Sequence, residues 1–211
     1  MGYFFLDIET FIDDEVKYSA LNPFTSKSKV IAIAYNYYNE FKISEKIIRK
    51  PTVLKEWELG EKKILEDFYT FAKLKIPDDK HFKYLGFNCI KFDLSYLMGR
   101  LIIHEIDTPE NIYFNLFTAP HIIDLGQISQ ILSNNKFKEI MNINQKTTNS
   151  FFDLPIKQGT GKDVTKFYKN KEFEKIEKYI SEEFSFELLY LKLKRHIYKK
   201  ETMIKNVVTS N

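Results

Sequence analysis

The spacing of apolar and polar positions changes several times along the chain, and the first changes predict strands. Residues 3–8 form a short apolar and aromatic run that turns polar near its end, which is typical of a buried strand. Residues 29–38 and 41–48 are two further runs of this kind, and the polar residues 39–40 lie between them. Two apolar runs joined by so short a polar link predict an antiparallel hairpin. We therefore expect the chain to begin with three strands.

Beyond the first strands, helical and strand patterns alternate. Apolar residues recur at helical spacing over residues 60–75, and Pro77 is expected to end that helix. Residues 82–87 then predict a strand, and residues 91–103 predict a helix. A further short strand is expected near residues 122–123. This alternation predicts an α/β fold in which helices cover a mixed sheet.

The second half of the chain has one long helical pattern. Residues 125–155 combine helical and loop features without a clear period, and residues 159–169 predict a helix after a glycine-containing turn. Apolar positions then follow helical spacing throughout residues 172–197, which predicts one long helix. Residues 198–211 are mostly polar and are expected to form a frayed tail. We expect residues 1–197 to form a single domain.

Composition narrows the classes of protein. With 211 residues and 44% hydrophobic side chains, the chain can bury a sizeable core. The single cysteine excludes a disulfide within the chain, and four scattered histidines provide no cluster for structural zinc. No apolar run approaches the roughly 18 residues of a membrane span, and the N-terminus lacks a signal-type pattern. We therefore expect a soluble, cytoplasmic protein.

The net charge of +3 is too small to indicate nucleic-acid binding by itself. The positions of the lysines along the chain are more informative about nucleic-acid binding than the net charge. One group of lysines either faces phosphates or forms an ordinary solvated surface, and the sequence leaves both interpretations open. Its members are Lys157, Lys162, Lys166 and Lys169.

Acidic residues form the first candidate site. Asp7 and Glu9 lie two positions apart at the end of the first predicted strand. Because strand side chains alternate between two faces, both carboxylates point to the same side and can bind one cation. The pattern alone is weak, since it recurs by chance at Asp13 and Glu15. The position of Asp7 and Glu9 after a buried strand distinguishes them from that loop pair.

Two later segments add side chains of the same chemistry. Asn88 follows a predicted strand, and Asp93 stands near the N-terminus of the next predicted helix, where it either joins the acidic site or caps the helix. In the last long helix, Tyr179 and Glu183 are four residues apart and therefore share one face.

Together these three segments resemble the Exo I, Exo II and Exo III motifs of the DEDD superfamily of 3′ to 5′ exonucleases. The resemblance is to the tyrosine subclass, and within it to the proofreading domain of family-B DNA polymerases and related stand-alone exonucleases. It extends from residue 3 to about residue 194 and includes the glycine-containing residues 159–164. The resemblance implies a ribonuclease H-like fold, with a mixed β-sheet flanked by helices.

The resemblance also implies a ligand set and a mechanism. Two divalent cations, Mg²⁺ or Mn²⁺, would be held by Asp7, Glu9, Asp93 and Glu183. Tyr179 would orient the attacking water, and the backbone of Thr10 with the side chains of Asn88 and Phe92 would approach the 3′ terminal nucleotide. Hard cations prefer such oxygen ligands, and a pair of them can catalyse in-line phosphodiester hydrolysis.

The expected function is therefore the release of nucleotides from the 3′ end of single-stranded DNA, as in DNA repair. No polymerase module fits within 211 residues, so no covalently linked polymerase is expected. The family usually has Asp where this chain has Glu183, and the added methylene alters the ligand geometry. Two alternatives follow: a catalytically weakened homologue that still binds nucleic acid, and an exonuclease that acts on RNA.

Overall fold

The structure of the protein is a computed structural model. It describes residues 2–12, 22–39, 49–76, 82–133 and 143–209, and the side chains of the last segment as far as Lys199. The predicted strand at 41–48 and the acidic pair at Asp13 and Glu15 lie outside the described residues. None of the described helices combines the length and the apolar character of a membrane-spanning segment.

A five-stranded mixed sheet forms the centre of the molecule, with the strand order β3-β2-β1-β4-β5. The strands are β1 (Tyr3–Ile12), β2 (Ser28–Tyr38), β3 (Thr52–Lys55), β4 (Lys83–Gly86) and β5 (His121–Asp124). β2 pairs antiparallel with β1 and β3, whereas β4 pairs parallel with β1 and β5. Within the described residues, β2 therefore has an antiparallel strand on each side, and the parallel pairing is confined to β1, β4 and β5.

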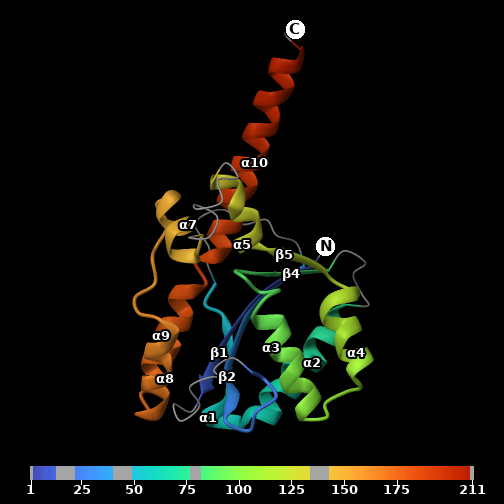
Figure 1. Ribbon diagram of the computed structural model, residues 1–211, viewed down its shortest axis with the longest axis vertical. Coiled ribbons are helices and arrows are strands. Elements are labelled where there is room, and N and C mark those ends of the chain that lie inside the picture. Colours follow the sequence, from blue (N-terminus) through green and yellow to red (C-terminus); the bar gives the residue numbers. More distant parts are fainter. Residues whose placement is uncertain (1, 13–21, 40–48, 77–81, 134–142, 210–211) are drawn as a thin grey trace.

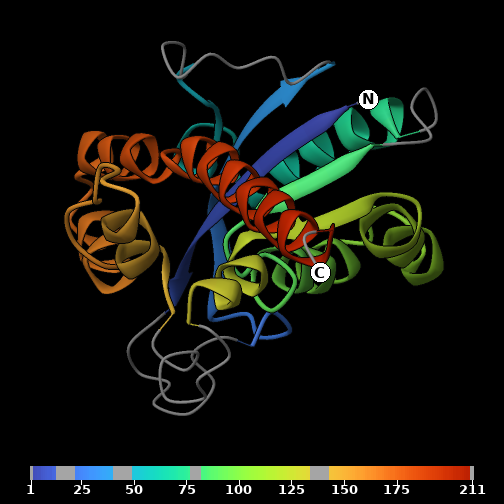
Figure 2. The ribbon, with the colours of Figure 1, turned by 90° about the horizontal axis from the view of Figure 1, so that it is seen from above.

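Helices cover both faces of this sheet (Figure 1). One face carries α2 (Glu61–Lys75), α3 (Asp93–Ile103), α4 (Pro109–Tyr113) and the π-helix Phe114–Thr118. The other carries α5 (Leu125–Ile128), the 3-10 helix Ser129–Ser133, α7 (Gln145–Phe151), α8 (Gly161–Lys169), α9 (Phe173–Glu183) and α10 (Phe186–Thr209). The short helix α1 (Glu56–Leu59) links β3 to α2. Viewed from above, α2, α3 and α4 lie on the opposite side of the sheet from α8 and α9 (Figure 2).

The alternation of side chains along β1 separates two hydrophobic cores. Phe4, Leu6 and Ile8 point into the core beneath α2 and α3. Tyr3 and Phe5 point the other way, into the core shared with α8, α9 and α10. Asp7 and Glu9 continue the second series, so the same period of two directs both carboxylates toward α8 and α9.

The prediction of one long helix over residues 172–197 is wrong, because α9 ends at Glu183 and α10 begins at Phe186. Phe184 and Phe186 are both fully buried, with their ring centroids 4.9 Å apart. In a continuous helix, residues two apart point about 200° away from each other, so the chain must break to bury both rings in one core. α10 then continues to Thr209, well into the segment that was expected to form a frayed polar tail (Figure 1).

Helix α7, in the region without a predicted pattern, stabilises this break. The side-chain amide of Gln145 donates a hydrogen bond of 2.9 Å to the carbonyl oxygen of Glu183. The amide of Asn149 donates to the hydroxyl of Ser185, also at 2.9 Å. The first bond satisfies a backbone carbonyl at the end of α9, and the second holds the side chain of Ser185 within the break.

Candidate active site

Three carboxylates from two elements converge at the C-terminal half of β1. One ligand oxygen from each of Asp7, Glu9 and Glu183 lies within 4.8 Å of the other two. Glu9 and Glu183 are buried, and Asp7 is partly buried. Local geometry explains the convergence, because β1 places Asp7 and Glu9 on one face and α9 packs Glu183 against that face. The register of β1 against β2 shifts just after Glu9.

Asp93 approaches the same pocket from the other side of β1. It is the first residue of α3, and its Oδ1 accepts a hydrogen bond of 3.0 Å from the backbone N–H of Ile8. The pairing of β1 with β4 ends at Phe5. Beyond that point, the carboxylate of Asp93 accepts the hydrogen bond from the backbone of β1 at Ile8. Phe92, not Asp93, is the N-cap residue of α3. The side chain of Asp93 therefore binds the backbone of β1 and lines the pocket.

The four acids line one pocket of about 300 Å³. Asn88, Phe92 and Tyr179 also line this pocket, together with Lys157. Asn88 adopts a positive φ of 60°, and its backbone N–H donates to Asp124 at 2.9 Å, which fixes the turn after β4. Thr10 follows Glu9 in β1 but is not among the residues that line the pocket. The structure thus brings seven of the eight predicted site residues together.

Burial and mutual repulsion raise the pKa values of Asp7, Glu9 and Asp93. Burial raises the pKa of Asp7 well above its usual value, and the charges of Glu183, Asp93 and Glu9 raise it further. Burial and the charge of Glu183 raise the pKa of Glu9 in the same way. Burial raises the pKa of Asp93 to about 7, although the hydrogen bond from Ile8 opposes this shift. Ionising these three groups together is therefore unfavourable without a compensating positive charge.

Lys157 supplies one positive charge, and the sequence had indicated this residue only as one member of a lysine group. Its ammonium group contacts the carboxylate of Glu183, and it lies 4.7 Å from the centroid of the Tyr179 ring. Burial alone would lower the pKa of Lys157, but the charges of Glu183 and Asp7 raise it above its usual value. The other three lysines of its sequence group are exposed on α8. The structure therefore separates Lys157 from the group and places it inside the site.

Tyr179 completes the wall of the pocket on α9. It is 5% exposed, and it lies one helical turn before Glu183. Burial raises the pKa of its hydroxyl, and the nearby charges of Glu183 and Glu9 raise it further. The hydroxyl therefore stays protonated at neutral pH and can both donate and accept a hydrogen bond.

Comparisons with known proteins find similarity among solved structures. No protein-family model and no curated protein matches the sequence. Among solved structures, the family B DNA polymerase of the archaeon Pyrobaculum calidifontis is similar over 92% of this chain, with 15% identity and a TM-score of 0.61. Escherichia coli Exonuclease I in complex with a dA16 oligonucleotide is similar over 63% of this chain and 30% of its own, with 16% identity and a TM-score of 0.37.

The likeness to the polymerase, together with the five-stranded mixed sheet and its covering helices, defines a ribonuclease H-like α/β fold. The predicted fold class is therefore confirmed. This chain spans about a quarter of the length of the polymerase chain (24%). At 15% identity the likeness concerns the fold, so chemistry has to be argued from the pocket itself.

Proposed function

We propose that this chain is a metal-dependent 3′ to 5′ exonuclease of the tyrosine subclass, which releases nucleotides from single-stranded DNA. The observation that carries the proposal is the convergence of Asp7, Glu9 and Glu183 within 4.8 Å, on a ribonuclease H-like fold. Buried acids brought this close destabilise a protein unless they bind a cation or share protons. Such sites are therefore candidates for function rather than for stability.

The residues present fit a hard divalent cation. The donor set consists of carboxylate oxygens, which Mg²⁺ and Mn²⁺ prefer. Oδ2 of Asp7 is buried and has no hydrogen-bond partner within the described part of the chain, so it is available as a ligand. Asp7, Glu9, Asp93 and Glu183 would hold the cations. When bound, divalent cations would polarise the scissile phosphate and lower the pKa of a coordinated water.

The other side chains of the pocket would position the substrate. The ammonium of Lys157 balances the charge of Glu183 and can also approach a phosphate oxygen. The protonated hydroxyl of Tyr179 would orient the attacking water. Phe92 and Asn88 also line the pocket, and they would contact the terminal nucleotide. The backbone of Thr10, next to Glu9, would contact the same nucleotide from the rim.

Hydrolysis of 5′-labelled single-stranded DNA with Mg²⁺ or Mn²⁺ tests the proposal. The wild-type protein should produce a ladder of products that shorten one nucleotide at a time. Asp7→Ala should abolish the ladder, whereas Glu110→Gln, an exposed acid on α4, should leave it unchanged. Undiminished cleavage by Asp7→Ala would refute the assignment of the site. Matched RNA substrates in the same assay establish which sugar the enzyme prefers.

One observation favours a second function, a weakened homologue that binds nucleic acid. Glu183 is one methylene longer than the Asp usual in the resembling family, and its carboxylate is engaged by Lys157. The contact with Lys157 and the longer side chain would each change how this acid meets a cation. Glu183→Asp distinguishes the two functions. A gain in cleavage supports an enzyme limited by this side chain, and persistent binding without cleavage in either protein supports the binding function.

A further inference from the structure

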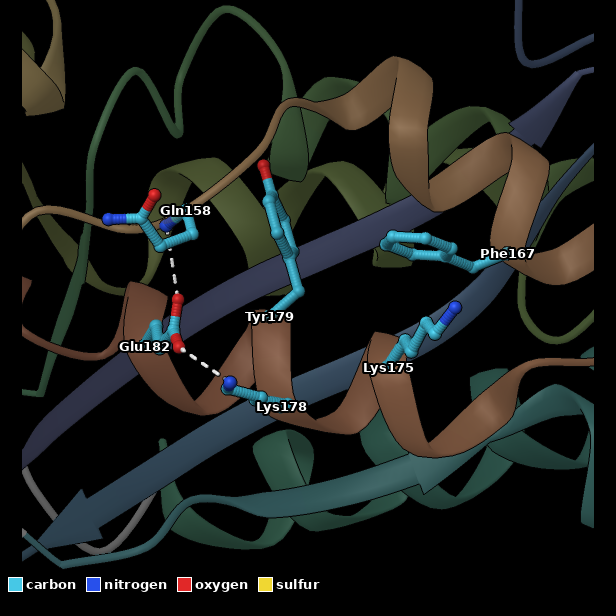
Figure 3. Close-up of a pocket in the computed structure, with 6 residues that line it drawn as sticks. All are labelled: Gln158, Phe167, Lys175, Lys178, Tyr179 and Glu182. Atoms are coloured by element: carbon cyan, nitrogen blue, oxygen red, sulfur yellow. Dashed lines mark hydrogen bonds and ion pairs between the residues drawn. The ribbon is translucent and has the colours of Figure 1, made fainter.

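A second pocket lies against the outer side of the candidate active site. It has a volume of about 280 Å³ and is formed by α8, α9 and the loop before α8 (Figure 3). Six residues line it, namely Gln158, Phe167, Lys175, Lys178, Tyr179 and Glu182. Figure 3 shows the rings of Tyr179 and Phe167 on either side of an open space, with the two lysines extending from α9.

Tyr179 belongs to both pockets and forms the wall between them. Its hydroxyl is near the charges of Glu183 and Glu9, and the same residue lines the second pocket. Gly159 approaches the same ring: a Cβ atom at that position would lie 3.8 Å from two of its carbons. The second pocket is thus separated from the acidic cluster by the thickness of one side chain.

The second pocket combines aromatic surface with positive charge. Lys175 and Lys178 are three residues apart on α9 and therefore share one face of the helix. The Nζ atom of Lys175 lies 5.3 Å from the centroid of the Phe167 ring. The second pocket therefore has flat apolar surfaces for a planar group and two ammonium groups for an anion.

The acid in the second pocket is already partly satisfied. Glu182 accepts a hydrogen bond of 3.1 Å from the backbone N–H of Gln158, and it is 4.0 Å from Lys178, at the limit of an ion pair. Lys175 pairs at 3.0 Å with Glu172, which is not among the lining residues. Lys178 is 79% exposed in its side chain, so it can turn to an incoming anion at little cost.

We propose that this second pocket binds one nucleotide, with its base against Tyr179 and Phe167 and its phosphate at Lys175 and Lys178. The carboxylate of Glu182 would accept hydrogen bonds from the sugar hydroxyl or from the base. The volume is at the lower end of the range of about 300–1,000 Å³ for small-molecule sites, which suits one nucleotide. Binding here needs neither a divalent cation nor hydrolysis, so the inference goes beyond the proposed function.

Titration of Asp7→Asn protein with dAMP in the presence of a metal chelator tests this proposal. Without divalent cations the acidic cluster repels phosphate, so calorimetry or ligand-observed NMR reports binding elsewhere. The double variant Lys175→Gln/Lys178→Gln in this background should weaken dAMP binding by about fivefold or more. The matched control Lys162→Gln/Lys166→Gln, on the exposed face of α8, should change it by less than about twofold. Deoxyadenosine and inorganic phosphate should each bind more weakly than dAMP.

Three results would overturn the proposal: no dAMP binding in chelator, equal weakening by both double variants, or binding that depends on added Mg²⁺. A short oligonucleotide in the same titration identifies the source of the nucleotide. If a strand occupies the pocket, the Lys175/Lys178 variant also weakens oligonucleotide binding. If the pocket holds a released mononucleotide, oligonucleotide binding is unchanged. Because the proposed nuclease activity is measured separately on wild-type protein, failure of either proposal is distinguishable from failure of the other.

Discussion

Removing one charge from the acidic cluster should stabilise the protein when no divalent cation is present. Asp7→Asn is the sharpest change, because the asparagine side chain has the same shape and Asp7 interacts with all three other acids of the site. In most buried positions the loss of a charged group costs stability. Here the sign should reverse, since repulsion among the acids outweighs the attraction between Asp7 and Lys157.

The magnitude follows from the spacing of the carboxylates. Their ligand oxygens lie within 4.8 Å of one another. At an effective dielectric constant of about 20, each such pair repels by about 3.5 kcal/mol. Asp7→Asn removes the repulsion from Glu183, Asp93 and Glu9 and loses the attraction to Lys157, so the net effect is at most about two such pairs. Partial protonation of the cluster reduces this further, and we expect a gain of about 1–3 kcal/mol in the free energy of unfolding.

The pH dependence of this gain has a definite sign. The pKa of Asp7 is raised in the folded protein, so the cost of ionising it is absent at low pH. The cost grows as the pH rises above the ordinary value of 3.8. Asparagine carries no such proton, so the stability difference between Asp7→Asn and wild type should increase with pH.

Urea unfolding in chelator, at about pH 6 and about pH 8, measures this difference. Glu110→Gln serves as the control and should shift the midpoint only slightly. Addition of Mg²⁺ should then stabilise wild type by mass action and stabilise Asp7→Asn much less. An Asp7→Asn protein that is less stable than wild type in chelator at the higher pH would refute the electrostatic account of the site.

Three further changes test other parts of the structure. Glu187 is buried on α10, and burial raises its pKa to about 7 from the ordinary 4.5. The free-energy cost of ionising this side chain in the folded protein therefore appears as the pH rises through this interval. In urea unfolding, Glu187→Gln should stabilise the protein by roughly 3 kcal/mol at about pH 8 and should have no such effect at about pH 4. Lys157→Met should lower the cleavage rate by about 10²-fold or more, because it removes the positive charge beside Glu183, while a circular dichroism melt shows the fold intact. Arg100→Met should cost about 3 kcal/mol in unfolding, because it removes the 2.7 Å ion pair with Glu61 and leaves that carboxylate only the backbone N–H of Val30 and the ring of His104 as partners within the described residues.

Those features of the site that depend on local periodicity could be predicted from the sequence. The period of two along β1 placed Asp7 and Glu9 on one face, and the helical period placed Tyr179 and Glu183 on another. Asp93 stands at the start of α3, as the strand-to-turn-to-helix pattern indicated. Its hydrogen bond to Ile8 is a contact across 85 residues, and no local pattern reports it.

Lys157 and the break before α10 could not be predicted for related reasons. Lys157 lies in a loop outside any periodic element, and the packing of α8 and α9 against β1 determines its position. Phe184 continues the apolar spacing of a helix although α9 has already ended at Glu183. The sequence pattern therefore gives no sign of the break. Only the tertiary structure shows that Phe184 and Phe186 must enter the same core as Phe5.

The direction and the metal dependence of cleavage distinguish the proposed 3′ to 5′ exonuclease from other nucleases. We would incubate the wild-type protein and Mg²⁺ with two single-stranded DNA substrates that carry the same 5′ label, one with a free 3′ terminus and one with an inverted 3′ terminus. The account predicts a descending ladder from the free terminus alone, which disappears in chelator. Equal degradation of both substrates, or a ladder that persists in chelator, would contradict it.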